Sequence, residues 1–535
     1  MTSMTIPNRY KMLLGDAYQE PQAASGWQLS RRLAASGLYG ANGMQFGPDG
    51  RLYVTQAFGS QITAVDISTG ALELISPLGG AIVAPDDIAF DSHGNFYATE
   101  VMSARVCMRT PAGEVSIVSD ELPAANGITC HEDRIFIDEF RGHGRIFELY
   151  PHDDRPPRLI ADDQRGPNAL AVGPDGKLYF PLVPLGEVWR VDIETGEREK
   201  VVEGLKGPPA VKFNRTGELI VPQAGTGEVV RIDIQTGAKT VIAQVRPGID
   251  NLAISPDNRL FISHFIDGGV AEVATDGSNA ERVLVPGGLV GPWGLSCGAN
   301  GMLYIADGLS LATLSASGAV GRLGGLLDNS FPGFVRGMAT GAPGELLLTT
   351  MAGDVVRYYP ASLSFEYVIR KLNQAYGLAR EASGSVVVTE AGTGSVLRID
   401  ANGQSSAVAT GLSQPCSVAV AEDGSLFVSE LGNGGVSKVD TNGGVSSVVA
   451  GLKQPLALAL RQDALLILDH GTKTLASVNL ATHQQQTLAS HLPIGNPAGL
   501  SRGPMDFAGS LAVDEDGTIY IPGDAEGSVL MLQHQ

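Results

Sequence analysis

Five side chains that carry carboxylate or amide oxygens recur about every forty residues in the first half of the chain. They are Asn42, Asp86, Asn126, Asn168 and Asp250. If the repeats place them around one point, they offer the oxygen ligands that a hard divalent cation binds. The alternative is that each side chain caps its own turn by bonding to nearby backbone. Their recurrence favours a shared metal site.

The same position in the second half of the chain carries no such set. Aligning the repeats on the first apolar residue of each strand gives Trp293, Arg336, Tyr376, Cys416, Leu456 and Gly509 there. In the first half, Pro209 is the exception among six aligned residues. The asymmetry predicts metal chemistry in the first half. Arg336 and Tyr376 are candidate substrate contacts, because a cation and an aromatic hydroxyl can orient a polar substrate.

A second polar residue ends the next strand of most repeats, where the turns place it on the same rim. In the first half these residues are Gln56, Glu100, Glu139, Gln223 and His264. A carboxylate or imidazole near a metal-bound water can act as a general base, so Glu139 and His264 join Asp250 as catalytic candidates. Gln56, Glu100 and Gln223 are candidate substrate contacts.

The structural alternative for this second set is supported by the other half of the chain. Glu390 and Glu430 occupy the same place there, within "VTEAGTGSVLRID" and "VSELGNGGVSKVD". His264 has no counterpart at the aligned position.

The repeats that carry these residues have one pattern. "ANGMQFGPDGRLYVTQ" from Ala41 and "PNALAVGPDGKLYFPL" from Pro167 are two of twelve copies. Each copy has a polar lead, an apolar strand, a glycine turn and a second strand, and turns such as Pro174-Asp175-Gly176 indicate β-hairpins. Two more strands close each unit, as in "GEVVRIDIQTG" followed by "AKTVIAQV". Four short strands per repeat are typical of a β-propeller blade.

Twelve blades exceed one closed ring of ordinary size. The sequence therefore predicts an all-β fold of two tandem six-bladed β-propellers with four-stranded blades. We expect an N-terminal segment at 1–38, a first propeller with the active site at 39–287 and a second propeller at 288–535. The last repeat has three strands, so residues 27–36 (WQLSRRLAAS) are expected to complete it and remove an exposed sheet edge. An insertion at 493–507 should lie on the rim face.

Composition limits the classes of partner. The 535 residues carry a formal net charge of −20, with 43% hydrophobic and 18% charged residues. An acidic chain lacks the basic footprint that nucleic acid or an anionic membrane requires, so neither is expected as a partner. A small-molecule substrate is expected instead.

Other features limit location and mechanism. The four cysteines have no CxxC spacing, so we expect reduced thiols. The N-terminus lacks the apolar run of a secretory signal, which predicts a cytoplasmic protein. HExxH and GxxxxGK[ST] motifs are absent from the sequence.

The stretches "AANGI", "GPNALAVGPDGKLYF" and "IDNLAISPDNRLFIS" resemble the senescence marker protein/gluconolactonase family, whose members are six-bladed propellers with a catalytic divalent metal. NHL-repeat propellers and virginiamycin B lyase are similar more loosely. The resemblance implies that Asn126 and Asn168 are metal ligands and that Asp250 is a ligand that assists proton transfer. Asn42 stands where the family has a glutamate, and the acids here are Asp86 and Asp250.

These expectations combine into a metal-dependent hydrolase of the lactonase type that acts on a small-molecule lactone or ester. Its cofactor would be calcium, magnesium, manganese or zinc. One alternative is a carbon–oxygen lyase or isomerase in which a base such as His264 removes a proton. Another is a non-enzymatic propeller that binds a protein or a ligand.

Overall fold

The structure is a computed structural model that describes residues 8–153, 155–326, 330–495 and 509–535. The described residues form twelve antiparallel sheets of four strands, one of which gains a short fifth strand. Most of the predicted insertion at 493–507 lies outside the described residues. The four cysteines are free thiols. Within the described ranges, no helix has the length and apolarity that a membrane span needs.

The chain divides into two compact units, Met1–Leu13 with Ser36–Gly288 (unit 1) and Leu14–Ala35 with Leu289–Gln535 (unit 2). The predicted N-terminal segment 1–38 is thus shared between them. Each sheet of unit 1 contains four strands that follow one another along the chain. They are, sheet by sheet, β3 (Met44–Phe46), β4 (Leu52–Gln56), β5 (Gln61–Val65) and β6 (Leu72–Ser76); β7 (Pro85–Phe90), β8 (Phe96–Glu100), β9 (Arg105–Arg109) and β10 (Val115–Ser119); β11 (Ala125–His131), β12 (Arg134–Glu139), β13 (Gly144–Leu149) and β14 (Arg158–Gln164); β15 (Ala171–Val172), β16 (Leu178–Leu182), β17 (Glu187–Val191) and β18 (Arg198–Val202); β19 (Lys212–Phe213), β20 (Leu219–Pro222), β21 (Glu228–Ile232) and β22 (Lys239–Gln244); and β23 (Ile249–Ile254), β24 (Leu260–His264), β25 (Val270–Val273) and β26 (Glu281–Val285).

Unit 2 repeats the arrangement, with two added strands from the N-terminal part of the chain. Its sheets are β27 (Pro292–Cys297), β28 (Leu303–Asp307), β29 (Ser310–Leu314) and β30 (Val320–Gly325); β31 (Val335–Thr340), β32 (Leu346–Thr350), β33 (Val355–Tyr359) and β34 (Ser364–Ile369); β35 (Ala375–Arg380), β36 (Val386–Glu390), β37 (Ser395–Ile399) and β38 (Ser405–Ala409); β39 (Pro415–Val420), β40 (Leu426–Glu430), β41 (Gly435–Val439) and β42 (Val445–Val449); β43 (Pro455–Arg461), β44 (Ala464–Asp469), β45 (Thr474–Asn479) and β46 (Gln485–Ser490) with β1 (Gln22–Ala23); and β47 (Ala512–Val513), β48 (Ile519–Gly523) and β49 (Ser528–His534) with β2 (Trp27–Leu33). The helical elements are α1 (Arg9–Leu14), η1 (Gly15–Ala17), η2 (Val183–Leu185) and η3 (Ala299–Gly301).

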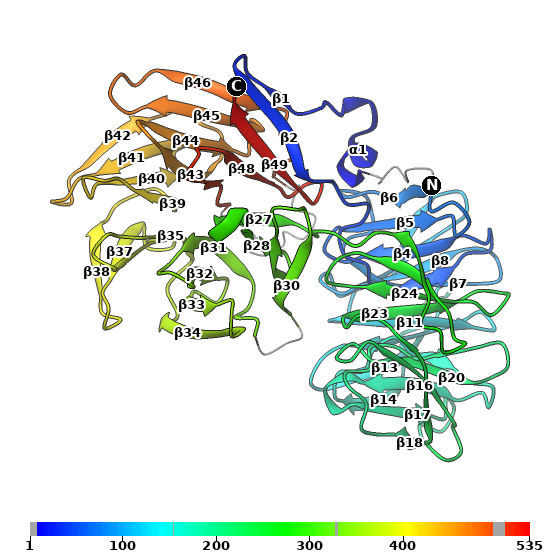
Figure 1. The fold of residues 1–535 in the computed structure, drawn as a ribbon. Helices are drawn as coiled ribbons and strands as arrows, with labels where there is room; N and C mark the ends of the chain where they lie inside the picture. Colours follow the sequence, from blue (N-terminus) through cyan, green and yellow to red (C-terminus); the bar gives the residue numbers. More distant parts are fainter. Residues whose placement is uncertain (1–7, 154, 327–329, 496–508) are drawn as a thin grey trace. The chain divides into compact units, whose positions relative to one another are not determined.

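The first strand of each sheet, here called the inner strand, contacts the inner strands of the two neighbouring sheets. In unit 1 these contacts run from β3 through β7, β11, β15, β19 and β23 and back to β3. In unit 2 they run from β27 through β31, β35, β39, β43 and β47 and back to β27, and Figure 1 looks into this second ring. Both rings close, so each unit is a β-propeller of six blades.

Turn chemistry and apolar packing explain why the repeats form blades. In the hairpin between β15 and β16, Gly176 has φ 75°, and Asp175 Oδ1 accepts a hydrogen bond from Lys177 N at 3.2 Å. Large apolar side chains then fill the space between neighbouring sheets, as where Tyr179 packs with Leu219 and Val230. Burial between sheets orients every blade with its inner strand toward the axis.

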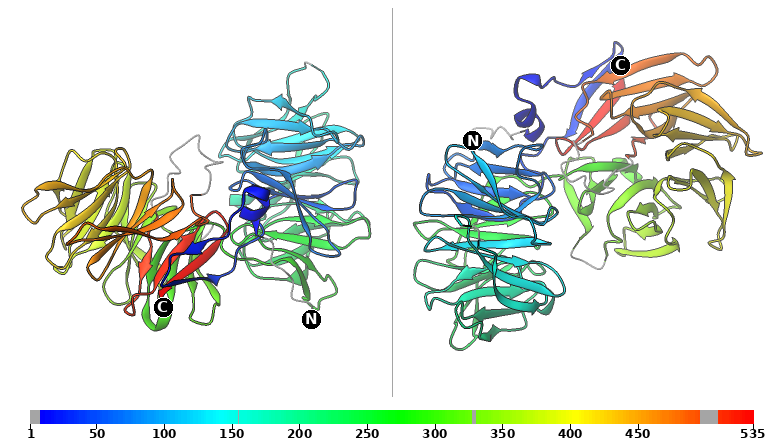
Figure 2. Two further views of the ribbon diagram at one scale, coloured as in Figure 1. Left: turned by 90° about the horizontal axis from the view of Figure 1, so that it is seen from above. Right: turned by 180° about the vertical axis from the view of Figure 1, so that it is seen from behind.

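The outermost strand of the last sheet is β2, which pairs antiparallel with β49 from Trp27 opposite His534 to Leu33 opposite Val529. Both views of Figure 2 show this blue strand alongside the red C-terminal strands. Arg31 Nε donates to Glu526 Oε1 at 2.7 Å, and the Glu526 side chain is fully buried. The last sheet of unit 2 is therefore completed by a strand that lies far from the other three in the sequence.

Candidate functional site

The five predicted ligands lie at one end of the inner strands of unit 1, and we call them the polar ring. Asp86, Asn126 and Asp250 lie near the starts of β7, β11 and β23, and Asn42 and Asn168 lie two and three residues before the starts of β3 and β15. Because the inner strands form a closed ring, these residues share one rim around its axis.

Hydrogen bonds between blades fix the backbone of this ring. Ser263 Oγ donates to Asn42 O at 2.8 Å, and Gly43 N donates to Asp86 O at 2.8 Å. Thr99 Oγ1 donates to Asn126 O. The backbone carbonyls of three ring residues are thus held by the preceding blade, independently of what their side chains do.

One ring side chain is a cap, as the structural alternative predicts. Asn42 Oδ1 accepts a hydrogen bond from Ala57 N at 3.0 Å, which is the first backbone N–H after β4. In the third blade the equivalent N–H, Phe140 N, donates instead to Ala124 O at 2.9 Å. Asn126 is therefore not needed as a cap, although Asn42 and Asn126 both occur in the tripeptide Ala-Asn-Gly.

Four side chains of the polar ring have no hydrogen-bond partner among the described residues, and we call them the open ring residues. They are Asp86, Asn126, Asn168 and Asp250. Asn126 is only 6% exposed and its Oδ1 is buried, whereas buried polar groups in proteins are nearly always paired. Uncommitted oxygens from four blades at one rim are suited to binding an external partner.

The two acids of the polar ring repel one another. Burial raises the pKa of Asp86 well above its ordinary value, and the charges of Asp250, Asp87 and Asp138 raise it further. Burial and the charge of Asp87 raise the pKa of Asp250 to about 7. Both side chains keep some accessible surface, but the surrounding protein disfavours their ionised forms. A cation among them would relieve this repulsion.

Two further acids lie beneath the ring and were missed by the sequence analysis. Asp87 bridges two blades, because its Oδ1 accepts from Ile88 N at 2.9 Å and its Oδ2 accepts from Ile128 N at 3.3 Å. Its pKa is raised by burial, while the charge of Lys212 acts to lower it. In the sequence, the position of Asp87 directly after the candidate ligand Asp86 could have indicated it.

Asp138 is the other missed acid. Its Oδ1 accepts from Gly127 N at 3.0 Å, and its Oδ2 is buried without a partner among the described residues. Burial is the main cause that raises its pKa to about 8. The sequence could have indicated Asp138, because this acid stands where the repeats of other blades have Thr55, Thr99 or Ser263.

The predicted substrate contacts at the ends of the second strands are engaged by the protein itself. Gln56 Oε1 accepts from Tyr39 N at 2.8 Å, Glu100 Oε1 from Val83 N at 3.1 Å, and Gln223 Oε1 from Lys206 N at 2.8 Å. In unit 2, Glu390 and Glu430 accept the same kind of bond from Asn373 N and Ser413 N, each at 2.7 Å. In these five blades the side chain secures the loop that leads into the inner strand, a structural task.

The two catalytic candidates in this set differ. Glu139 Oε2 accepts hydrogen bonds from Arg141 Nε at 2.9 Å and Arg145 Nε at 2.8 Å, so the protein itself engages this carboxylate. His264 is 3% exposed, and its Nε2 has no partner among the described residues. Burial lowers the pKa of His264 to about 4, with Asp267 acting against that change, so the imidazole is neutral at pH 7.

The two candidates from the second half belong to the ring of unit 2. Arg336 and Tyr376 are 2% and 5% exposed, and the Arg336 guanidinium lies over the Tyr376 ring at 4.6 Å from its centroid. They form a buried cation–π pair on two neighbouring inner strands. The structure therefore gives them a packing role and assigns them to a ring other than the polar ring.

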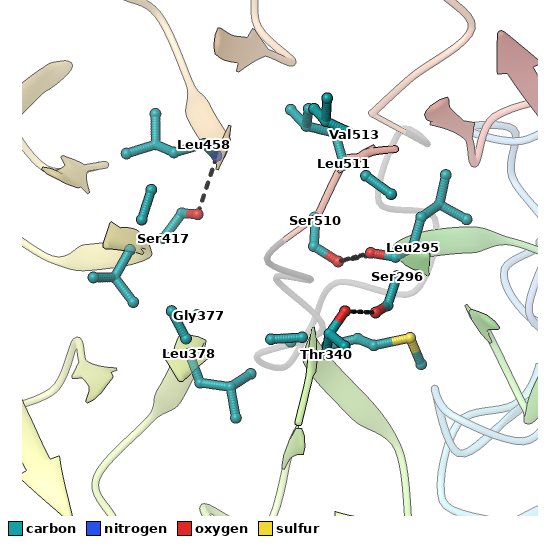
Figure 3. A pocket seen from close by; sticks show the side chains of 18 of the residues that line it. Leu295, Ser296, Thr340, Gly377, Leu378, Ser417, Leu458, Ser510, Leu511 and Val513 are labelled. Atoms are coloured by element: carbon teal, nitrogen blue, oxygen red, sulfur yellow. Dashed lines mark hydrogen bonds between the residues drawn. The ribbon is translucent and has the colours of Figure 1, made fainter. Parts of the chain in front are cut away.

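A pocket of about 250 Å³ lies inside the ring of unit 2 and is lined by all six of its inner strands. Figure 3 shows its hydroxyl groups: Ser296 Oγ lies 2.7 Å from Thr340 Oγ1, Ser510 Oγ donates to Leu295 O, and Ser417 Oγ accepts from Leu458 N. None of the residues that line it carries a charge. The repeats give no sign of this pocket, because its lining has no charged or amide side chain.

No protein family and no curated protein sequence matches the chain. Among solved structures it is similar to a gluconolactonase from Xanthomonas campestris, with 17% identity over 46% of this chain and 92% of that chain and a TM-score of 0.39. Virginiamycin B lyase from Staphylococcus aureus is 15% identical over 62% of this chain and 98% of its own, with a TM-score of 0.32. A nidogen/laminin complex is 20% identical over 37% and 78%, with a TM-score of 0.33. The first two are enzymes of the kinds that the repeats resemble.

Proposed function

We propose that unit 1 is a cation-dependent hydrolase of small lactones or esters and that the polar ring is its site. The observation that supports this most is the set of four open ring residues. Leaving polar side chains unpaired at one rim, with one oxygen, Asn126 Oδ1, fully buried, costs stability there, which is typical of sites kept for a ligand.

The donor set suits a hard divalent cation. Two carboxylates and two amides offer oxygen ligands, and the unpaired Oδ1 of Asn126 is a buried acceptor ready for one. Among the described residues, no three His, Cys, Asp or Glu side chains are grouped closely enough to hold a metal by themselves. A cation at this rim would therefore depend on the amides of Asn126 and Asn168 as well as on Asp86 and Asp250.

A bound divalent cation would polarise a substrate carbonyl and lower the pKa of a nearby water. The protein's own side chains would transfer the protons and orient the substrate. Asp250 takes a proton from the attacking water as the water oxygen adds to the carbonyl carbon, and the proton then passes to the leaving oxygen as the acyl C–O bond breaks. The amide groups of Asn126 and Asn168 orient the ester.

The test is a screen of neutral lactones with the full chain after chelation, with and without calcium, magnesium, manganese or zinc. We expect hydrolysis that depends on one of these ions. Asp250→Asn should lower kcat/KM about a thousandfold and release the cation, with an unchanged melting profile. Asp233→Asn, at an exposed turn of the same unit, is the matched control. Full activity and stoichiometric cation in Asp250→Asn would refute the proposal.

A second candidate function rests on the pocket of unit 2. Because its lining is uncharged and mixes hydroxyl with apolar groups, we propose that it binds a small uncharged molecule. Cyclohexanol, cyclohexylamine and cyclohexanecarboxylate form a matched set of probes. Ligand-observed NMR should show saturable binding of cyclohexanol alone, and Leu458→Phe should abolish it by filling the pocket. Equal binding of all three probes, or binding that persists in the variant, would count against it.

A further inference from the structure

Three large apolar side chains are exposed on neighbouring blades of unit 1, and we call them the apolar rim. Met102, Phe140 and Leu185 are 57%, 39% and 44% exposed. Each follows the second strand of its blade, in the loops after β8, β12 and β16. Exposed large apolar side chains that gather on one face of a protein mark interaction sites.

The loops that carry the apolar rim lie against the residues that lead into the polar ring. Phe140 N donates to Ala124 O at 2.9 Å, two residues before Asn126. The Phe140 ring also lies over Gly166, where a methyl group would meet its Cε2 at 3.4 Å, and Gly166 lies two residues before Asn168. The apolar rim is therefore adjacent to the open ring residues.

The next loops of unit 1 extend the apolar rim on one side. After β8, Ser103 N donates to Glu100 O at 3.0 Å, which folds the Met102 loop back over its own blade. After β4 and β24, the partly exposed Phe58 meets the buried Phe265 edge to face, with their ring centroids 5.7 Å apart. Apolar side chains thus occur on this face in the blades that begin with β3, β7, β11, β15 and β23.

Unit 2 lacks such a rim in the part of the chain that the structure describes. Its exposed large apolar side chains are on outer strands or on turns elsewhere: Val320, Leu326, Leu363, Tyr367 and Val445. The loops after its second strands carry Met351 and Leu431, which are partly buried, and otherwise residues such as Gly392-Thr393 and Gly432-Asn433. The apolar rim therefore occurs in the unit that has the polar ring and is not a general property of these repeats.

We infer that the substrate of the polar ring is a lactone or ester with an apolar chain, which the apolar rim holds while the carbonyl meets the open ring residues. This inference rests on the proposed function. The polar ring and the apolar rim contain no cationic side chain that would pair with an anionic substrate, which favours a neutral one. A neutral group with an apolar tail matches both surfaces at once.

The experiment compares γ-butyrolactone with γ-decalactone, which share a ring and differ in an apolar tail. In the full chain, Met102→Ser, Phe140→Ser and Leu185→Ser should each lower kcat/KM for γ-decalactone about fivefold to tenfold, through KM, and change it less than twofold for γ-butyrolactone. Val241→Ser is the matched control, because Val241 is 52% exposed on the outer strand β22 of the same unit. Equal losses on both lactones, or none, would overturn the inference.

Binding of the neutral dye N-phenyl-1-naphthylamine separates this inference from the proposed function. If no lactone is hydrolysed but the three variants weaken dye binding at least fivefold relative to Val241→Ser, the apolar rim stands and the hydrolase proposal fails. If lactones are hydrolysed without preference for the tail, the hydrolase stands and the apolar rim fails. If the variants change only the oligomeric state measured by light scattering, the surface joins copies of this chain and the inference is overturned.

Discussion

Asp138 is an acid at a position where neighbouring blades have a hydroxyl. Thr99, its equivalent, donates to the carbonyl of Asn126 in the next blade, whereas Asp138 leaves Oδ2 buried and unpaired within the described residues. An unpaired buried oxygen is costly, so stability does not explain this residue. Its charge also raises the pKa of Asp86, which ties it to the polar ring.

We predict that Asp138→Thr stabilises unit 1 and weakens its site. Urea unfolding at pH 7 should show a gain of about 2 kcal/mol, because the unpaired carboxyl is removed and the threonine can bond the next blade. Calorimetric titration with calcium should show at least tenfold weaker binding. Asp120→Thr, at an exposed acid of the same unit, is the control. A variant that is less stable and binds calcium as the parent does would contradict both parts.

His264 provides a prediction on pH. Its pKa is about 4 in the folded protein and 6.5 in the unfolded chain, so the unfolded chain binds more protons between these values. Stability from the neutral imidazole is therefore present above pH 6.5 and is lost as the pH falls toward 4. Between pH 7 and pH 5 the loss should be about 2 kcal/mol.

His264→Gln is the matched variant, because glutamine occupies the same position in two other blades as Gln56 and Gln223. Urea unfolding at pH 7 and pH 5 should show the parent losing about 2 kcal/mol more than the variant. Buried His470 titrates equally in both proteins and cancels. Identical losses would show that the imidazole is accessible to protons in the folded state.

At the scale of the elements, glycine allows the inner strands to meet at the axis. Gly127 follows Asn126 in β11, and a Cβ at this position would overlap Ala169 N of the next blade and Asp138 Oδ2. Any larger residue must separate the third and fourth blades at the polar ring.

We predict that Gly127→Ala destabilises unit 1 by about 3 kcal/mol, because the overlap involves backbone that cannot move aside. It should also lower lactone hydrolysis at least tenfold, since Asn126 and Asn168 would move apart. Gly142→Ala in the same blade is the control, because nothing lies within 4 Å of its added methyl group. Thermal unfolding and the lactone assay measure both effects, and equal behaviour of the two variants would refute this packing argument.

The elements were predictable from sequence because their signals are local. Alternating apolar residues and turns such as Pro174-Asp175-Gly176 predict hairpins, and the repeat of four strands predicts the twelve four-stranded sheets that the structure has. Counting strands in the last repeat placed residues 27–36 against the C-terminal strand, where β2 lies.

The roles of the ring side chains were not predictable, because they depend on bonds between distant residues. Asn42 and Asn126 stand in the same tripeptide, yet one caps Ala57 N and the other has an unpaired oxygen. The difference arises because Phe140 N is already bonded to Ala124 O. Likewise, the sequence does not reveal that the Glu100 side chain accepts a hydrogen bond from Val83 N and so holds the loop before β7.

At the scale of the whole molecule, the two rings close in different ways. Unit 1 closes between β23 and β3, both within one continuous stretch of chain, with Ser263 Oγ bonded to Asn42 O. Unit 2 depends on β2, whose Trp27 and Leu29 pack against the core of the last two sheets. The N-terminal residues are thus an integral part of the C-terminal propeller.

We predict that deleting residues 1–35 destabilises unit 2 by about 5 kcal/mol, because β49 loses its partner strand and Trp27, Leu29 and Leu33 no longer cover the core. Deleting residues 1–20 is the control, since it removes α1 as well but keeps β2. Differential scanning calorimetry should show the same unit 1 transition in both variants and a lower unit 2 transition only in the longer deletion. A peptide of residues 22–35 should restore that transition, because it supplies the missing strand. If the two deletion variants show the same unit 2 transition, β2 is dispensable and the contacts between the inner strands are enough to stabilise the ring of unit 2.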